Sequence, residues 1–177
     1  LAILEKYKDE GKIILINLEK NVGKKRALSK AMAIAKGEIF AFTDSDSIWA
    51  PYAISRVVRI FEHDPAVGAV SGHSRVLNAE DTLFTQIQDP WYECQYSVRK
   101  AFESVFGCVT CVSGPIAIFR REAVFNFIPA WENDRFLGQE FKFATDRTLT
   151  GFVLGSTTVG AGLKEKYKDS PFVSSVD

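Results

Sequence analysis

Short apolar runs alternate along the chain with stretches whose apolar residues recur at helical spacing. The runs are rich in β-branched residues and are bounded by glycine, proline or polar residues, so each predicts a strand. Strands are expected at residues 12–18, 38–43, 67–77, 109–119 and 156–159. Helices are expected at residues 1–8, 24–36, 51–62, 80–105, 121–127 and 148–154. This alternation predicts an α/β fold with a mostly parallel central sheet flanked by helices.

Residues 80–105 form the longest helical stretch, and Pro90 within it is expected to break or kink the helix. The stretch is rich in aromatic residues: Phe84, Trp91, Tyr92, Tyr96, Phe102 and Phe106. They could form a stacking platform or a membrane-facing surface. We interpret them as part of the core, because an aromatic stripe more often packs inside a protein.

Two acidic residues, Asp44 and Asp46, follow the buried strand 38–43 directly. Ligands of open α/β sheets bind at the carboxyl ends of the strands, which is where these side chains are expected. The two carboxylates can approach one hard cation, and oxygen ligands of this kind suit Mg²⁺ or Mn²⁺. A simpler interpretation is that Asp46 or Ser47 caps a helix entered near Pro51.

Three basic residues, Lys24, Lys25 and Arg26, stand at the start of the expected helix 24–36. Backbone N–H groups and the helix dipole favour an anion at such a position, and the basic side chains add to this preference. The alternative is a basic turn that is simply solvated.

Composition narrows the class of protein. The 177 residues suit one domain with a sizeable core, and 46% hydrophobic with 25% charged residues are ordinary for a globular protein. The 22 basic and 22 acidic residues balance, so no overall field favours nucleic acid or an anionic membrane. No apolar run approaches the roughly 20 residues of a membrane span. The chain opens on Leu1 within a helical pattern, which fits a fragment.

The cysteines are Cys94, Cys108 and Cys111. An odd number in a chain without a secretory signal favours reduced, intracellular thiols. Cys108 and Cys111 have the C-x-x-C spacing, but no second pair accompanies them, and the chain's histidines are His63 and His73 alone. We therefore interpret the cysteines as small buried apolar residues rather than as a zinc or redox site.

Several short motifs follow one another in order along the chain. They are Gly23-Lys24-Lys25-Arg26-Ala27-Leu28, Asp44-Ser45-Asp46, Val67-Gly68-Ala69-Val70-Ser71-Gly72, Asn78, Ser113-Gly114-Pro115, Phe119-Arg120 and Asp146-Arg147-Thr148-Leu149-Thr150. The ordered set resembles the cytosolic catalytic domain of processive family-2 glycosyltransferases, above all hyaluronan synthases and the related chitin synthases. The resemblance covers nearly the whole chain. It implies a GT-A-like nucleotide-diphospho-sugar transferase fold that is incomplete at both ends.

For the donor, the resemblance implies roles in the first two motifs. Lys24 and Lys25 would lie at the donor nucleotide, and Asp44 would contact the ribose or the sugar of the donor. Asp46 would bind a divalent cation, Mg²⁺ or Mn²⁺, that bridges the diphosphate. Lys25 stands where the family usually has arginine, which keeps the charge but loses the planar fork.

For the acceptor, the resemblance implies that Ser113-Gly114-Pro115 and Arg147 line the site where the acceptor sugar meets the donor. Asp146, in the family's Gly-Asp-Asp-Arg segment, would be the general base. Thr145 replaces the first Asp of that segment. On local sequence alone, Asp146 could instead cap a helix or pair with Arg147.

Parts of the family's protein are expected to lie outside this chain. The first β-α-β unit, which holds the nucleotide base, would precede Leu1. The Gln-x-x-Arg-Trp motif, which holds the diphosphate and the acceptor end, would follow Asp177, and the transmembrane helices would lie elsewhere too. We therefore interpret residues 1–177 as a single catalytic domain, a fragment of a membrane protein with this part at the cytoplasmic face of the cell membrane.

The predicted function is metal-assisted, inverting transfer of a sugar from a nucleotide-diphospho-sugar, expected to be a UDP-sugar, to a growing polysaccharide or glycan. Two alternatives stay open. A non-catalytic relative could bind the nucleotide-sugar or a partner, since a fold does not imply a function. A haloacid-dehalogenase-type phosphatase also places Asp-x-Asp after an apolar strand, with the first Asp as nucleophile. In this chain, Ile48 stands where that family has Thr or Val.

Overall fold

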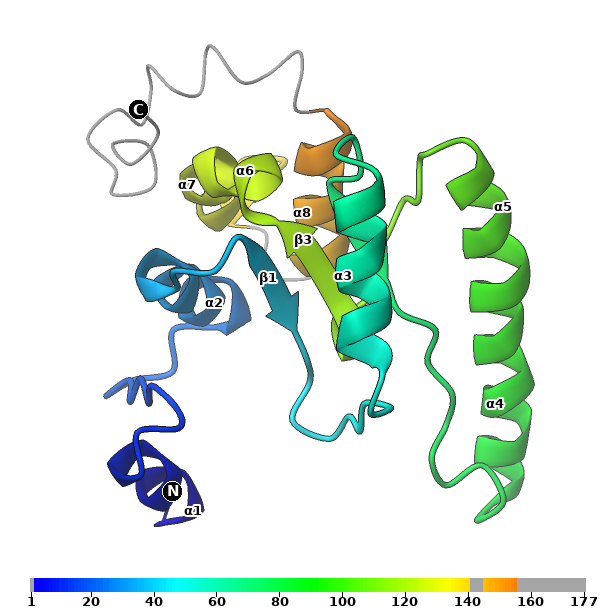
Figure 1. Ribbon diagram of the computed structural model, residues 1–177, viewed down its shortest axis with the longest axis horizontal. Helices are drawn as coiled ribbons and strands as arrows, with labels where there is room; N and C mark the ends of the chain where they lie inside the picture. The colour runs from blue at the N-terminus through cyan, green and yellow to red at the C-terminus, as the bar shows by residue number, and fades with distance from the viewer. Residues whose placement is uncertain (1, 141–144, 156–177) are drawn as a thin grey trace.

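The computed structural model describes residues 2–140 and 145–155. A three-stranded sheet lies at its centre, with helices packed on both faces (Figure 1). The strands are β1 Ile39–Phe42, β2 Ala69–Ser71 and β3 Ala117–Arg120, in the order β1-β3-β2. The expected combination of helices with a central sheet is confirmed, but the strands are shorter than the sequence predicted.

The strands of this sheet pair in antiparallel fashion, with Phe40 opposite Phe119 and Val70 opposite Ile118. β1 and β2 run in the same direction, because each is antiparallel to β3, but β3 lies between them. The expectation of a mostly parallel sheet is therefore wrong for the described residues. The pattern of apolar residues locates strands, but it does not say which strand inserts between two others.

The apolar run 12–18 does not form a strand. Its residue Ile14 is 76% exposed, and Ile13 and Ile16 are also exposed. A strand needs a hydrogen-bonded neighbour, and none of the strands in the described part of the chain lies beside this run. Of the three elements expected over residues 12–43, the helix and the second strand are therefore present.

Eight α-helices are present in the described residues: α1 Ala2–Asp9, α2 Lys24–Ile34, α3 Ala53–His63, α4 Leu83–Cys94, α5 Ala101–Val105, α6 Arg121–Val124, α7 Ile128–Glu132 and α8 Thr145–Leu154. A π-helical segment covers Gln95–Lys100, and 3-10 turns cover Gly114–Ile116 and Phe125–Phe127. A small hairpin joins β4 Arg135–Phe136 to β5 Gln139–Glu140. The helices expected from apolar spacing at 1–8, 24–36 and 51–62 are confirmed within a few residues at their ends.

The two faces of the sheet bury separate clusters of side chains, because successive residues of a strand point to opposite faces. In β3, Phe119 belongs to a cluster that includes Met32 of α2 and Trp131 of α7. Ile118 packs instead with Val57 of α3. Helices on both sides thus hold β1 and β3, and with them the loops that follow β1 and precede β3.

Helix α4, the segment Gln95–Lys100 and α5 continue one another as a rod beside the sheet (Figure 1). Of the expected break or kink at Pro90, the break does not occur, because Pro90 lies within α4. The rod begins with a capping box, in which the hydroxyl of Thr82 accepts a hydrogen bond from the backbone N–H of Thr85 and the hydroxyl of Thr85 accepts one from the N–H of Thr82.

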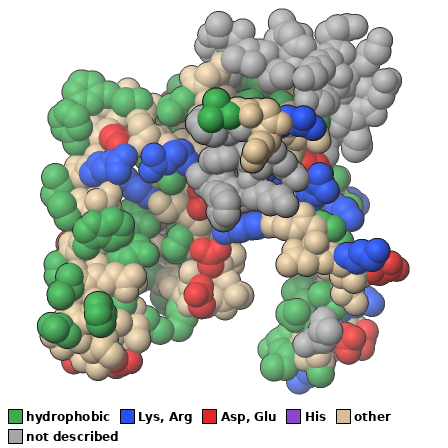
Figure 2. Space-filling model, turned by 180° about the vertical axis from the view of Figure 1, so that it is seen from behind, with side chains coloured by type: hydrophobic (Ala, Val, Ile, Leu, Met, Phe, Trp, Pro, Cys, Tyr) green, Lys and Arg blue, Asp and Glu red, His purple; other side chains and the backbone are tan. Residues whose placement is uncertain are grey.

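Most aromatic residues of the rod point away from the core. Phe84, Trp91, Phe102 and Phe106 are exposed, whereas Tyr96 is buried. Figure 2 shows hydrophobic side chains along this side of the molecule. The interpretation of the aromatic stripe as core is therefore wrong for most of its members. Helical spacing indicates that residues share a face, but not that the face is covered.

The three cysteines are free thiols. Cys94 and Cys108 are exposed and Cys111 is half-buried, so their interpretation as buried apolar residues is wrong for the first two. The strand expected at 156–159 lies outside the described residues. None of the described helices is long and apolar enough to cross a membrane.

Candidate active site

Four residues from separate parts of the chain line one small cavity of about 30 Å³. Lys24 opens α2, Asp44 follows β1, Gly114 opens the 3-10 turn before β3, and Asp146 lies in the first turn of α8. β1 and β3 pair side by side in opposite directions. The end of β1 is therefore next to the start of β3, which brings Asp44 and Gly114 together.

The backbone N–H of Gly114 donates a hydrogen bond of 2.8 Å to Oδ2 of Asp146. A side-chain carbon at position 114 would lie 2.9 Å from Oδ2 of Asp44 and 3.0 Å from Oδ2 of Asp146. Both distances are shorter than an ordinary contact between carbon and oxygen, so a side chain at this position would displace at least one of the two carboxylates. The two carboxylates thus converge on one point beside the backbone of Gly114.

Lys24 supplies the positive charge at this point. Its Nζ donates a hydrogen bond of 2.9 Å to Oδ1 of Asp44. Burial lowers the pKa of Lys24, but the hydrogen bond to Asp44 and the charges of Asp146 and Asp44 outweigh it, so the pKa lies above its ordinary value. Two neighbouring carboxylates repel each other, and the ammonium of Lys24 offsets that repulsion.

The first turn of α8 is held from two sides. The indole N–H of Trp131, which is fully buried, donates a hydrogen bond of 3.1 Å to the carbonyl of Thr145. The hydroxyl of Thr150 donates to the carbonyl of Asp146 over 2.7 Å and accepts from the N–H of Val112 over 3.0 Å. The backbone of Asp146 is therefore fixed relative to the segment that carries Gly114.

Asp46 lies in the turn after β1 and is exposed. A hydrogen bond of 3.1 Å from the N–H of Ser47 to the carbonyl of Asp44 closes this turn. Helix α3 begins only at Ala53, and no side chain caps it. Neither Asp46 nor Ser47 therefore acts as its cap, which removes the simpler interpretation of the acidic pair.

The donor set around the acidic pair decides which kind of metal site it could form. Among residues 2–140 and 145–155, no three His, Cys, Asp or Glu side chains gather as they would in a site made by the protein alone. Mg²⁺ is usually held by one or two carboxylates and completes its shell with waters and substrate phosphates. Asp46 is exposed two residues after Asp44 and does not line the small cavity, and one or two carboxylates of this kind are enough for that type of site.

Residues 1–125 match the protein family described as Glycosyl transferase family 2. The chain belongs to glycosyltransferase family 2. It is 34% identical to hyaluronan synthase 3 of Xenopus laevis over 148 residues, which are 82% of this chain and 26% of that protein. It is 33% identical to hyaluronan synthase 2 of Gallus gallus over 135 residues, 75% of this chain and 24% of that protein. With human hyaluronan synthase 3 it shares 35% over 124 residues, 70% of this chain and 22% of that protein.

The chain thus spans about a quarter of the length of these relatives. The predicted resemblance and enzyme class are confirmed at the level of the family: the chain belongs to a glycosyltransferase family, is similar to hyaluronan synthases, and the family implies a GT-A fold. The interpretation as a haloacid-dehalogenase-type phosphatase is wrong.

In this glycosyltransferase, Lys25 does not reach the cavity that Lys24 lines. Its side chain is only 8% exposed, and its Nζ lies 3.6 Å from a carboxylate oxygen of Asp134 and 5.8 Å from the centroid of the Trp131 ring. Successive residues of an α-helix point about 100° apart, so two neighbouring lysines cannot both face one small cavity. The donor-binding role expected for Lys25 does not fit this placement. The contact of Lys25 with Asp134 instead joins α2 to the segment after α7.

The expected acceptor residues are only partly brought together. Ser113 is half-buried and accepts a hydrogen bond of 2.6 Å from Nζ of Lys100. The carbonyl of Pro115 accepts one of 2.9 Å from the indole N–H of Trp49. Arg147 is exposed on α8 and does not line the small cavity that Asp146 lines. Of the segment 113–115, Gly114 alone lines that cavity.

Trp131 is a cavity residue that belongs to none of the motifs singled out in the sequence. It lies in α7, is fully buried and forms part of the cavity wall. A signal was present in the sequence: Val124, Ile128 and Trp131 follow one another at helical spacing and are all buried. The helix expected at 121–127 therefore continues, through one 3-10 turn, as far as Glu132.

Proposed function

We propose that the protein transfers a sugar, with inversion, from a nucleotide-diphospho-sugar, in the first place a UDP-sugar, to a growing polysaccharide or glycan. The observation that carries this proposal is the convergence of Asp44, Asp146 and Lys24 around Gly114. At this point a carboxylate that can accept a proton lies beside an ammonium that can bind the negatively charged donor. Membership of glycosyltransferase family 2 supports the reaction type.

Asp146 is the general base of the proposed reaction. Its carboxylate accepts the proton of an acceptor hydroxyl as the oxygen of that hydroxyl attacks the anomeric carbon of the donor. The bond from the anomeric carbon to the diphosphate oxygen breaks, and the nucleoside diphosphate leaves with the electron pair. The attack comes from the face opposite the leaving group, which inverts the anomeric centre. The hydrogen bond from Gly114 orients the carboxylate for this step.

Lys24 and Asp44 would bind the donor, Lys24 through the diphosphate charge and Asp44 through hydroxyl groups of the ribose or the sugar. Asp46, with Asp44 beside it, would hold Mg²⁺ or Mn²⁺, which supplies positive charge to the diphosphate leaving group. Lys24 stays protonated for its part, because the neighbouring carboxylates raise its pKa. An ammonium at the first turn of α2 also adds to the preference of a helix N-terminus for phosphate.

Ser113-Gly114-Pro115 would form the rim that the acceptor sugar meets, and Arg147 would contact the acceptor farther out. The named relatives are hyaluronan synthases, so we propose an oligosaccharide or polysaccharide as acceptor. The parent protein would be embedded in the cell membrane, with this domain at the cytoplasmic face. No nucleic acid is expected to bind, because the 22 basic and 22 acidic residues balance.

The test is Asp146→Asn in the full-length protein, assayed with a panel of sugar nucleotides. Transfer should fall by roughly 10²–10⁴-fold while donor affinity stays nearly the same, because the amide cannot accept the proton but still accepts the hydrogen bond. Asp81→Asn, at an exposed position after Asn78, is the matched control and should keep full activity. Retention of most of the transfer rate by Asp146→Asn would refute the general base. A wild-type protein that binds donor without transfer would indicate the non-catalytic relative instead.

A further inference from the structure

Lys100 is a cation that the protein holds from three sides. Its Nζ donates hydrogen bonds of 2.6 Å to Oγ of Ser113 and 2.9 Å to Oγ of Ser71, and it lies 4.2 Å from the centroid of the Tyr96 ring. An ammonium has three N–H donors, so two hydroxyls and one aromatic face satisfy it. One side chain thus joins the rod, the end of β2 and the segment before Gly114.

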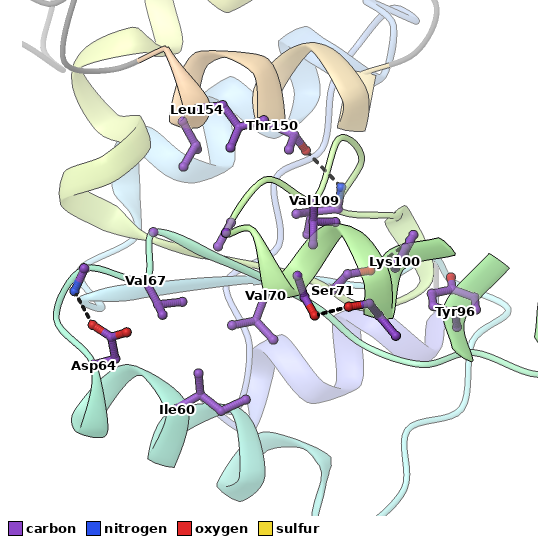
Figure 3. A pocket seen from close by; sticks show the side chains of 18 of the residues that line it. Ile60, Asp64, Val67, Val70, Ser71, Tyr96, Lys100, Val109, Thr150 and Leu154 are labelled. Carbon is purple, nitrogen blue, oxygen red and sulfur yellow. Dashed lines mark hydrogen bonds between the residues drawn. The ribbon is translucent and has the colours of Figure 1, made fainter. Parts of the chain in front are cut away.

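Lys100 and Tyr96 stand at one end of a larger cavity of about 700 Å³, which lies between β2, the rod and α8 (Figure 3). Its other end is lined by the apolar side chains of Ile60, Val67 and Leu154, together with the carboxylate of Asp64. Burial lowers the pKa of Lys100, with the charges of Cys111, Glu103 and Asp146 opposing this effect and that of Arg99 adding to it.

The placement of a cation here is unfavourable in itself. Burying a charge costs more than burying an apolar side chain of similar size, which is why an apolar replacement of a buried ion is often neutral or stabilising. Packing alone therefore does not require a lysine at position 100. What the lysine adds is a link between Ser71 and Ser113, two hydroxyls that no apolar side chain could join.

Ser113 connects this link to the candidate active site through a single peptide bond. The next residue, Gly114, donates its N–H to Asp146 and has no room for a side-chain carbon between Asp44 and Asp146. A small displacement of Ser113 would therefore move the hydrogen bond that orients the carboxylate of Asp146. Asp146 and Lys100 also attract each other directly as opposite charges.

We propose that Lys100 is a positioning residue of the transferase: it anchors Ser113 to the end of β2 and so holds Gly114 and Asp146 in place relative to Asp44. This inference rests on the proposed function of Asp146 as general base. Lys100 does not line the small cavity that Lys24, Asp44 and Asp146 share, and its effect on the reaction runs through Ser113.

Kinetics of the full-length protein test the anchor. Lys100→Met should lower kcat about tenfold or more with little change in the KM of the donor, because Lys24 and Asp44 stay in place. Lys100→Arg should recover much of the loss, since it keeps the charge and the donors and the adjoining cavity has room for the larger head. Lys36→Met, at an exposed position, is the control and should keep the wild-type kcat.

A double-mutant cycle shows whether the effect passes through Ser113. Ser113→Ala should reproduce the loss of kcat, and Lys100→Met combined with Ser113→Ala should be no slower than either single variant. Additive losses in the double variant, or a loss in Lys100→Met that appears in the KM of the donor instead of kcat, would overturn the proposal.

Hydrogen exchange resolved to single amides gives a readout that does not depend on activity. Lys100→Met should speed exchange of the Gly114 amide about tenfold or more, because its hydrogen bond to Asp146 is no longer held in place. The Val112 amide, which donates to Thr150, should keep its protection and serves as the internal reference. Unchanged protection of Gly114 would refute the positioning role even in an active enzyme. If Lys100→Met loses protection at the Gly114 amide and the wild-type protein transfers no sugar, the positioning role is supported and only the proposed function is refuted.

Discussion

The backbone N–H of Gly114 points at the carboxylate of Asp146 and donates to it over 2.8 Å. The residues lie 32 positions apart in the chain, yet this contact joins the segment before β3 to the first turn of α8. Asp44 reaches the same place from the end of β1. The absence of a side chain at position 114 is what allows two carboxylates and the ammonium of Lys24 to share so small a space.

We therefore expect Gly114→Ala to impair transfer strongly. The added carbon would meet Oδ2 of Asp44 at 2.9 Å and Oδ2 of Asp146 at 3.0 Å, so at least one carboxylate must move. A displacement of about 1 Å in an active site can reduce the rate by about 10²-fold, and a loss of this size is expected in kcat. Steady-state kinetics of the full-length protein would measure it.

Gly151→Ala is the matched control for this substitution. Gly151 lies in α8 and has nothing within 4 Å of the position that the new carbon would take. Alanine is a better helix former than glycine, so stability should rise by roughly 0.5–1 kcal/mol with kcat unchanged. Equal activity of the two alanine variants would show that the crowding at Gly114 has no part in the reaction.

The fold illustrates which local patterns suffice for prediction. The helices over 24–36 and 51–62 were predicted correctly because a helix satisfies its own backbone hydrogen bonds, so its signal lies within the segment. The prediction of a strand over 12–18 was wrong, because the backbone hydrogen bonds of a strand need a neighbouring strand, and the run itself holds no information about that neighbour. The antiparallel order β1-β3-β2 escaped prediction for the same reason.

The residues of the candidate site were likewise predicted only in part. The family resemblance assigned Lys24, Asp44 and Asp146 to one site, and all three line one small cavity. The resemblance placed Lys25 at the donor as well, but the turn of α2 directs it toward Asp134. Lys100 could not be foreseen, since its two hydroxyl partners lie 13 and 29 residues away and belong to no pattern.

A second prediction concerns acid stability. The guanidinium of Arg75 hydrogen-bonds the carboxylate of Asp89, with help from the N–H of Val76, and lowers the pKa of Asp89 from 3.8 to about 2. A carboxyl whose pKa is lower in the folded state stabilises the protein above its unfolded pKa and loses this effect as the pH falls through the folded value. The contribution should therefore be complete above about pH 4 and fade toward pH 2.

Thermal unfolding of Asp89→Asn and wild type at several pH values checks this sign. The difference in Tm should be largest at neutral pH and should narrow as the pH falls below 4, because the wild-type carboxyl is then protonated and resembles the amide. Asp9→Asn, at the exposed end of α1, should show no such dependence. A difference that stays constant down to pH 2 would contradict the role of the pair that ties α4 to the segment after β2.

The last prediction concerns the cation. Asp46 is exposed in the turn after β1, so Asp46→Asn should leave the free energy of unfolding nearly unchanged. If its carboxylate holds Mg²⁺ or Mn²⁺ against the diphosphate, the variant should lose at least ~10²-fold of the Mn²⁺-dependent rate, because charge that stabilises the leaving group is lost. A titration of the transfer rate with Mn²⁺, beside denaturant unfolding of the same samples, separates the two effects. Glu62→Gln, an exposed change on α3, should behave as wild type in both. Near-normal turnover by folded Asp46→Asn would exclude Asp46 as a ligand and leave Asp44 and Lys24 as the donor site.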